Sequence, residues 1–151
     1  MKIIVSACLL GHNCKYNGGN NYDAGVAAFL EGKEIIPVCP EALAGLGIPR
    51  TPMEIVDGVL INRDGVNVDQ PVRNAVAQIL KELDGQEIHC AILKSRSPTC
   101  GVHQIYDGTF SGTLIPGYGV TAELLRNHGV AVFGESRLAD LEAYLAREET
   151  P

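Results

Sequence analysis

Four short runs of apolar, β-favouring residues constrain the fold of this chain more than any other feature. They occupy residues 3–7, 34–39, 88–95 and 129–135, and the segments between them are long enough for crossover connections. The runs show almost no alternation of polar and apolar residues, which is typical of strands covered on both faces. The pattern predicts an open parallel sheet of about four strands.

Segments with helical periodicity alternate with these runs. The spacing of apolar residues predicts helices over 22–31, 70–83, 120–127 and 137–149. Strands that alternate with helices in this way predict an α/β fold, in which helices flank a parallel sheet.

The segments outside this alternation are rich in turn-forming residues. Two Asp-Gly turns within 54–68 predict a small β-hairpin insertion. Residues 40–52 and 96–119 are rich in Gly and Pro and are predicted to be loops.

Length and charge limit the classes of protein to consider. The chain has 151 residues, the size of one domain, and no linker or repeat divides it, so we predict a single domain over 1–151. The net charge of −6 argues against partners such as nucleic acid or an anionic membrane, because both require a basic face. Neither a membrane-spanning apolar run nor a signal peptide is recognisable in the sequence, so we predict a cytoplasmic protein.

Three of the five cysteines follow predicted strands. Cys8 and Cys39 come at the ends of the first two strands, and Cys100 follows the third after a short loop. Because the carboxyl ends of parallel strands meet at one edge of the sheet, we expect these three thiols to converge there. Cys90 lies inside the third run and is predicted to pack in the core.

Three converging thiols allow more than one chemistry. Structural zinc sites have four ligands and usually paired Cys-x-x-Cys motifs, which this chain lacks, and a lone redox cysteine needs no second thiol. An iron–sulfur cluster accepts thiolates that are scattered through a fold, and three of them leave one iron open to an outside ligand. Cys14 could supply a fourth thiolate, and His103 is an alternative ligand because it follows Cys100 by three residues.

Several motifs in register resemble one family over most of the chain. They are SACLLG with CKYNGG, VCPEALAGLGIPRTP, LKSRSPTCG, YDGTFSG and PGYGVTAELL, and they run from residue 4 to about residue 135. Together they resemble the signature of the small TudS-type thiouracil desulfidase family, formerly catalogued as a domain of unknown function. Asn17, Ala44 and Thr99 depart from residues that are common in the family, but none of these departures removes a ligand.

The resemblance implies a Rossmann-like α/β domain with an oxygen-sensitive [4Fe-4S] cluster, which can be lost in air. It implies an enzyme that removes sulfur from thiouracil or a similar small thiolated pyrimidine without net redox chemistry. The family's cluster ligands fall on Cys8, Cys39 and Cys100. The catalytic carboxylate falls on Glu41 and the catalytic hydroxyl on Ser97.

Taken without the family, the same residues have simpler interpretations. Glu41 could be a carboxylate in the first turn of a helix, where the helix dipole favours it, and Ser97 before a proline could start a turn. The YDGTFSG segment could cover the site, stack on a planar ring or form a surface turn. Competing functions for the thiols are a non-catalytic metal- or redox-sensing module and a cysteine-based sulfur-transfer protein. The sequence does not define the oligomeric state.

Overall fold

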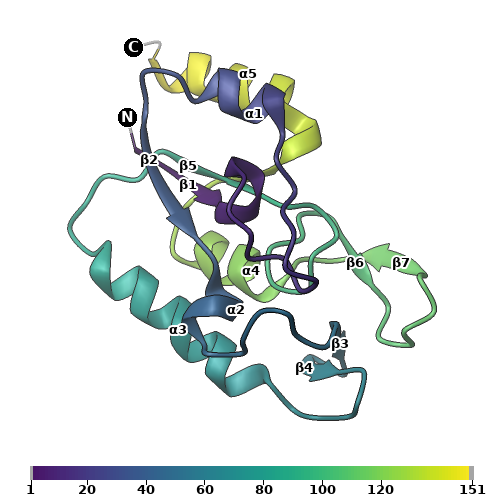
Figure 1. The fold of residues 1–151 in the computed structure, drawn as a ribbon. Coiled ribbons are helices and arrows are strands. Elements are labelled where there is room, and N and C mark those ends of the chain that lie inside the picture. The colour runs from purple at the N-terminus through teal and green to yellow at the C-terminus, as the bar shows by residue number, and fades with distance from the viewer. Residues whose placement is uncertain (1, 150–151) are drawn as a thin grey trace.

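The chain folds around a four-stranded parallel sheet with the strand order β2-β1-β5-β8 (Figure 1). A computed structural model describes residues 2–149. The strands are β1 (Lys2–Ser6), β2 (Glu34–Val38), β5 (Cys90–Leu93) and β8 (Val132–Gly134), and each adjacent pair is parallel. The predicted α/β fold with about four parallel strands is therefore confirmed. The strand order places β1 and β5 in the centre of the sheet.

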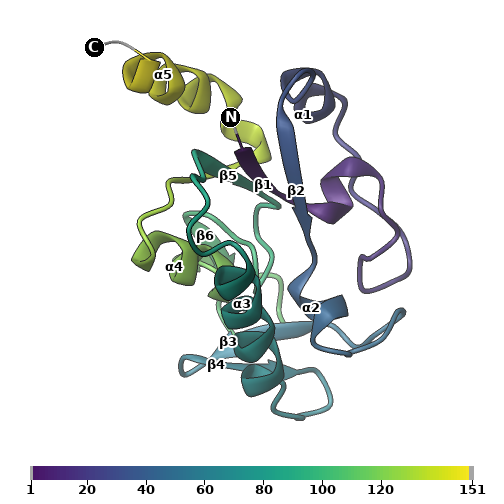
Figure 2. The same cartoon turned by 90° about the vertical axis from the view of Figure 1, so that its left-hand side faces the viewer.

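Helices cover both faces of the sheet (Figures 1 and 2). The helices α1 (Ala24–Phe29) and α5 (Leu138–Glu149) lie on one face, and α3 (Asp69–Glu82) and α4 (Val120–Asn127) lie on the other. Successive side chains of a strand point to opposite faces, so Ile3 packs toward α1 and α5 while Ile4 packs toward α4. Each central strand is therefore apolar on both sides, as the lack of alternation predicts.

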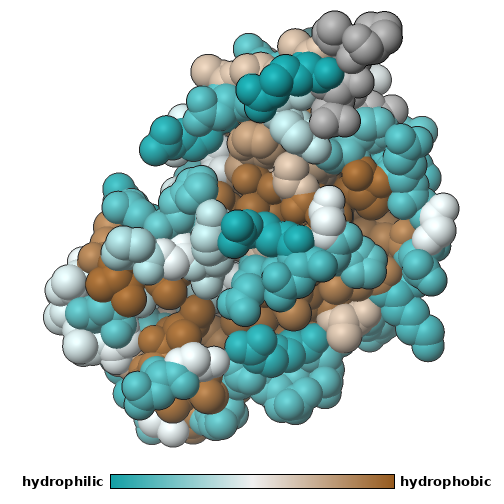
Figure 3. Space-filling view, turned by 180° about the vertical axis from the view of Figure 1, so that it is seen from behind, coloured by the Kyte–Doolittle hydropathy of each residue, from teal (hydrophilic) through white to brown (hydrophobic). Residues whose placement is uncertain are grey.

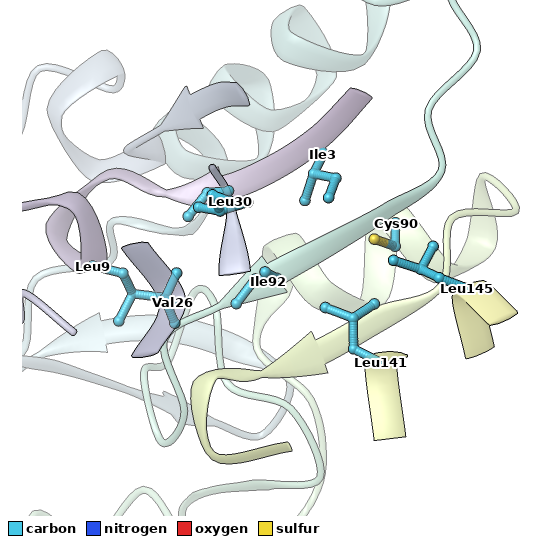
Figure 4. Close-up of a cluster of buried hydrophobic side chains, with 9 residues drawn as sticks. Ile3, Leu9, Val26, Leu30, Cys90, Ile92, Leu141 and Leu145 are labelled. Carbon is cyan, nitrogen blue, oxygen red and sulfur yellow. The ribbon is translucent and has the colours of Figure 1, made fainter. Parts of the chain in front are cut away.

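Cys90 belongs to the core between the sheet and the α1/α5 layer. It is fully buried among side chains such as Ile3, Ile92, Leu141 and Leu145 (Figure 4). The prediction that this cysteine packs in the core is confirmed.

The predicted hairpin insertion is formed by β3 (Met53–Val56) and β4 (Val59–Asn62), which pair antiparallel. Both predicted loops, however, contain regular structure. The short helix α2 (Pro40–Leu43) follows β2, and β6 (Gln104–Tyr106) pairs antiparallel with β7 (Leu114–Pro116). These elements span three or four residues each, so they are too short to produce a recognisable period in a sequence rich in Gly and Pro.

The outer surface is mixed in polarity. On the face seen in Figure 3, apolar residues form several patches separated by hydrophilic residues. Within residues 2–149, the structure contains no helix that combines the length and the apolar character needed to cross a membrane.

Candidate active site

The carboxyl ends of three neighbouring strands deliver the three predicted thiols to one edge of the sheet. Cys8 lies in a 3-10 turn, η1 (Ala7–Leu10), directly after β1, and Cys39 caps helix α2 directly after β2. Cys100 follows the central strand β5 after a six-residue loop and is 5% exposed. The Cys8 thiol raises the pKa of Cys100, and the Glu41 carboxylate raises the pKa of all three thiols. The expected convergence of these residues is present.

Burial makes these thiols difficult to ionise. Together with the Glu41 carboxylate, burial raises the pKa of the Cys100 thiol to about 12. Burial and the same carboxylate hold the pKa of Cys39 well above its ordinary value, and burial also raises the pKa of Cys8. A coordinated metal reverses this situation, because it binds the thiolate and removes the proton.

The donor set is suited to an iron–sulfur cluster. Three cysteine sulfurs are soft ligands of the kind such clusters use. Among the described residues, no three His, Cys, Asp or Glu side chains are grouped closely enough to hold a single metal ion. A cluster of several irons is larger than a single ion and accepts thiolates that are further apart.

Glu41 lies at the centre of a buried hydrogen-bonded chain. Glu41 lies in the first turn of α2, and the residue is 8% exposed. The hydroxyl of Thr99, which is fully buried, donates to Oε1 of Glu41, and the Cys39 thiol donates to Oε2 at 3.6 Å. The hydroxyls of Ser97 and Thr99 are 3.0 Å apart. The two predicted catalytic residues are thus joined through Thr99.

The geometry fixes the direction of the Ser97 hydroxyl. Ser97 Oγ accepts from the backbone N–H groups of Thr99 and Cys100 at 3.2 and 3.1 Å. Because the Thr99 hydroxyl donates its single hydrogen to Glu41, the Ser97 hydroxyl is the donor to Thr99. Ser97 therefore starts a turn, as predicted without the family. Its hydroxyl hydrogen also points to Thr99, which in turn donates to Glu41.

Cys14 lies near the three thiols, although it does not directly follow a strand in the sequence. Its backbone oxygen accepts from Arg50 Nη2 at 2.9 Å and from the Cys39 thiol at 3.9 Å, and its thiol raises the pKa of both Cys8 and Cys39. His103, in contrast, is exposed and its Nδ1 is 3.0 Å from the hydroxyl of Tyr118.

A cavity of about 540 Å³ opens beside these residues, with Glu41 and Ser97 in its wall. This volume is in the usual range for small-molecule sites. The wall carries five basic side chains in a chain of net charge −6, and three aromatic side chains. The basic ones are Lys15, Arg50, Arg63, Lys94 and Arg96, and the aromatic ones are Tyr16, Tyr106 and Phe110. The cavity therefore suits a small, polar, planar ligand.

The fourth strand also contributes to this edge. Glu135, in the turn η2 (Glu135–Arg137) after β8, accepts from the backbone N–H and the hydroxyl of Ser95 at 2.7 and 2.6 Å. It also forms an ion pair with Lys94 Nζ at 3.2 Å. Burial alone would raise the pKa of Glu135, but the Ser95 hydrogen bonds and the Lys94 charge lower it overall. The sequence signal for Glu135 is its position at the end of the fourth apolar run.

Comparison with known proteins gives concordant results. The family model described as 2-thiouracil desulfurase matches residues 3–137. A curated Bacillus subtilis (strain 168) protein described as uncharacterized protein YbbK is 36% identical over 149 residues, which cover 92% of this chain and 99% of that protein. A solved structure described as the [4Fe-4S]-dependent thiouracil desulfidase TudS matches with a TM-score of 0.88 and 36% identity, covering 96% of this chain and 97% of the other.

Proposed function

Because the chain belongs to the 2-thiouracil desulfurase family, we propose that it is a [4Fe-4S]-dependent desulfidase that acts on thiouracil-like thiocarbonyl compounds. The reaction consumes water, converts the thiocarbonyl carbon to a carbonyl and releases hydrogen sulfide. No electrons enter or leave, so the reaction requires no external oxidant or reductant.

Cys8, Cys39 and Cys100 would hold the cluster as thiolates. Their support is the arrangement at the carboxyl ends of three neighbouring strands, where the Glu41 carboxylate acts on the pKa of all three thiols. A cluster with three protein ligands supplies an open iron, which is a Lewis acid with an affinity for the substrate sulfur.

Glu41 is the base in this proposal. A buried carboxylate beside the cavity can remove a proton from a water molecule, which then attacks the thiocarbonyl carbon. Its Oε1 accepts from Thr99, so Oε2 would be the oxygen free to accept a proton from water, because a Cys39 thiolate that held the cluster would no longer donate to it. The Thr99 hydrogen bond fixes the orientation of the carboxylate.

Ser97 is the proton donor in this proposal. Two backbone N–H groups hold its oxygen in place. Its single hydrogen points to Thr99 in the free protein, so Ser97 donates to a ring atom of the substrate by rotating that hydrogen away from Thr99. Thr99 connects Ser97 to Glu41, and a proton taken up by Glu41 can return along this path.

The observation that carries the proposal is the hydrogen-bonded chain Glu41–Thr99–Ser97, whose two ends line the cavity and whose carboxylate lies near one buried and two partly buried thiols. The test is anaerobic reconstitution with iron and sulfide, followed by measurement of iron content and of sulfide released from 2-thiouracil. In water enriched in ¹⁸O, the uracil product should carry one labelled oxygen.

The Cys39→Ala variant serves as the negative control and should lose both the cluster and sulfide release. Reconstituted protein that holds four irons but releases no sulfide would overturn the proposal in favour of a sensing module. Sulfide release by protein without iron would favour a cysteine-based sulfur-transfer reaction.

A further inference from the structure

The turn between β6 and β7 supplies part of the cavity wall in an unusual backbone conformation. Tyr106 and Phe110 from this hairpin line the cavity together with Glu41 and Ser97. Phe110 has φ of 56°, in the left-handed region that bulky side chains rarely adopt. Such a conformation persists only where the surrounding structure holds it, and these sites concentrate at ligand-binding positions.

A buried carboxylate holds this turn in place. Glu54, on β3, is 8% exposed, and its Oε1 accepts from the backbone N–H groups of Gly108 and Phe110 at 2.9 and 3.2 Å. Within residues 2–149, Glu54 has no ion pair with Lys, Arg or His. Burial of an unpaired carboxylate is unfavourable unless hydrogen bonds compensate for the lost water. The two bonds to the turn are these compensating contacts.

Gly108 allows the turn to lie directly against β3. Its φ is 91°, and a side chain at this position would place Cβ 2.6 Å from the carbonyl oxygen of Ile55. Three separate features, the carboxylate of Glu54, the glycine and the left-handed Phe110, therefore serve to fix the same turn at the cavity.

We propose that Phe110 forms the wall against which the planar ring of the substrate stacks, and that Glu54 is a positioning residue that holds Phe110 there. The inference rests on the proposed function, because the ring in question is that of a thiouracil-like substrate. Of the three roles considered for the YDGTFSG segment, the inference selects stacking on a planar ring. An aromatic face favours a flat heteroaromatic ring over an acyclic thiocarbonyl compound.

The direct test is fluorine NMR of reconstituted protein labelled with 4-fluorophenylalanine. The chain has three phenylalanines, and Phe29 and Phe133 pack against the α1/α5 core, so they are internal controls. The Phe110→Tyr variant assigns the third resonance by its loss. Titration with uracil, which has the same ring and is not consumed, should shift the Phe110 resonance and leave the other two unchanged.

Kinetics with 2-thiouracil distinguish ring contact from a general structural role. Phe110→Ala should raise KM about tenfold while kcat changes less, and Phe110→Tyr should keep KM near the parent value. Glu54→Ala should raise KM in the same way, and Glu54→Gln should restore it, because the amide oxygen still accepts both N–H groups. Ser111→Ala, at an exposed position of the same turn, is the matched control.

Equal KM values for the Ala and Tyr variants at position 110 would overturn the inference. So would a Phe110 resonance that stays fixed while uracil competitively inhibits sulfide release. If the parent protein releases no sulfide, the proposed function fails by itself. The titration is then made with unconsumed 2-thiouracil, and absence of a Phe110 shift would overturn the stacking role separately.

Discussion

The core beneath α1 and α5 and the carboxyl edge of the sheet each contain a buried cysteine near strand β5, but the two cysteines have different surroundings. Cys90 is fully buried among apolar side chains, and burial, opposed by the charge of Lys33, raises its pKa to about 11. Cys100 is also buried and its pKa rises to about 12, yet it has Ser6, Thr99, Cys8 and Glu41 as neighbours. Burial alone therefore does not separate a packing thiol from a thiol in a site. The hydroxyls, the second thiol and the carboxylate around Cys100 make the distinction.

The largest expected effect tests this distinction directly. Cys100→Ala should abolish cluster binding and sulfide release, because it removes one of three thiolates. Cys90→Ala should keep full iron content and lose only roughly 1–2 kcal/mol of unfolding free energy. Iron analysis, visible absorbance and urea unfolding measure both properties. Equal iron content in the two variants would remove Cys100 from the ligand set.

Replacement of the central carboxylate should affect chemistry and leave folding intact. Glu41→Gln keeps the shape and the Thr99 hydrogen bond but removes the base, so kcat should fall by about 100- to 10,000-fold. Iron content and unfolding free energy should stay near the parent values. Glu123→Gln, an exposed position on α4, is the control. A Glu41→Gln variant with full activity would remove Glu41 as the base.

A substitution in the core should lower stability and leave kcat unchanged. Leu141 on α5 is fully buried in the same cluster as Cys90, and Leu141→Ala should lower the unfolding free energy by about 2–5 kcal/mol. At a temperature where the variant is still folded, its kcat for 2-thiouracil should equal that of the parent. A loss of kcat without a loss of stability would show that the two regions are coupled.

The contrast between the regions also explains how much the sequence predicts. The sheet, its flanking helices and the convergence of Cys8, Cys39 and Cys100 follow from strand periodicity and the rule that parallel strands share a carboxyl edge. The contact of Thr99 with Glu41 joins residues 58 apart in the chain, and that of Glu54 with Phe110 joins residues 56 apart. No local period marks such contacts, because they depend on how loops fold over the sheet. The β6–β7 hairpin is predicted to be a loop, because its short strands also lack a recognisable local period.

A smaller effect is expected from the link between Ser97 and Glu41. Thr99→Val keeps the buried volume but removes the hydroxyl, so kcat should fall about tenfold, which corresponds to one hydrogen bond to a charged group. Thr99→Ser restores the hydroxyl and should recover most of the rate. If Val and Ser variants have the same kcat, the hydrogen-bonded path plays no part in turnover.

The smallest effect concerns stability at the fourth strand end and depends on pH. The Ser95 hydrogen bonds and Lys94 outweigh burial and lower the pKa of Glu135 below its ordinary value of 4.5 in the folded protein. A group with a lowered folded pKa stabilises the protein above its unfolded pKa, and this contribution is lost as the pH falls through the folded pKa. Glu135→Gln should therefore unfold at lower urea concentration than the parent at pH 7, and the difference should shrink steadily below pH 4.5. A difference that is the same at pH 7 and in acid would mean that Glu135 acts through its shape and hydrogen bonds and that its charge has no part in stabilising this edge.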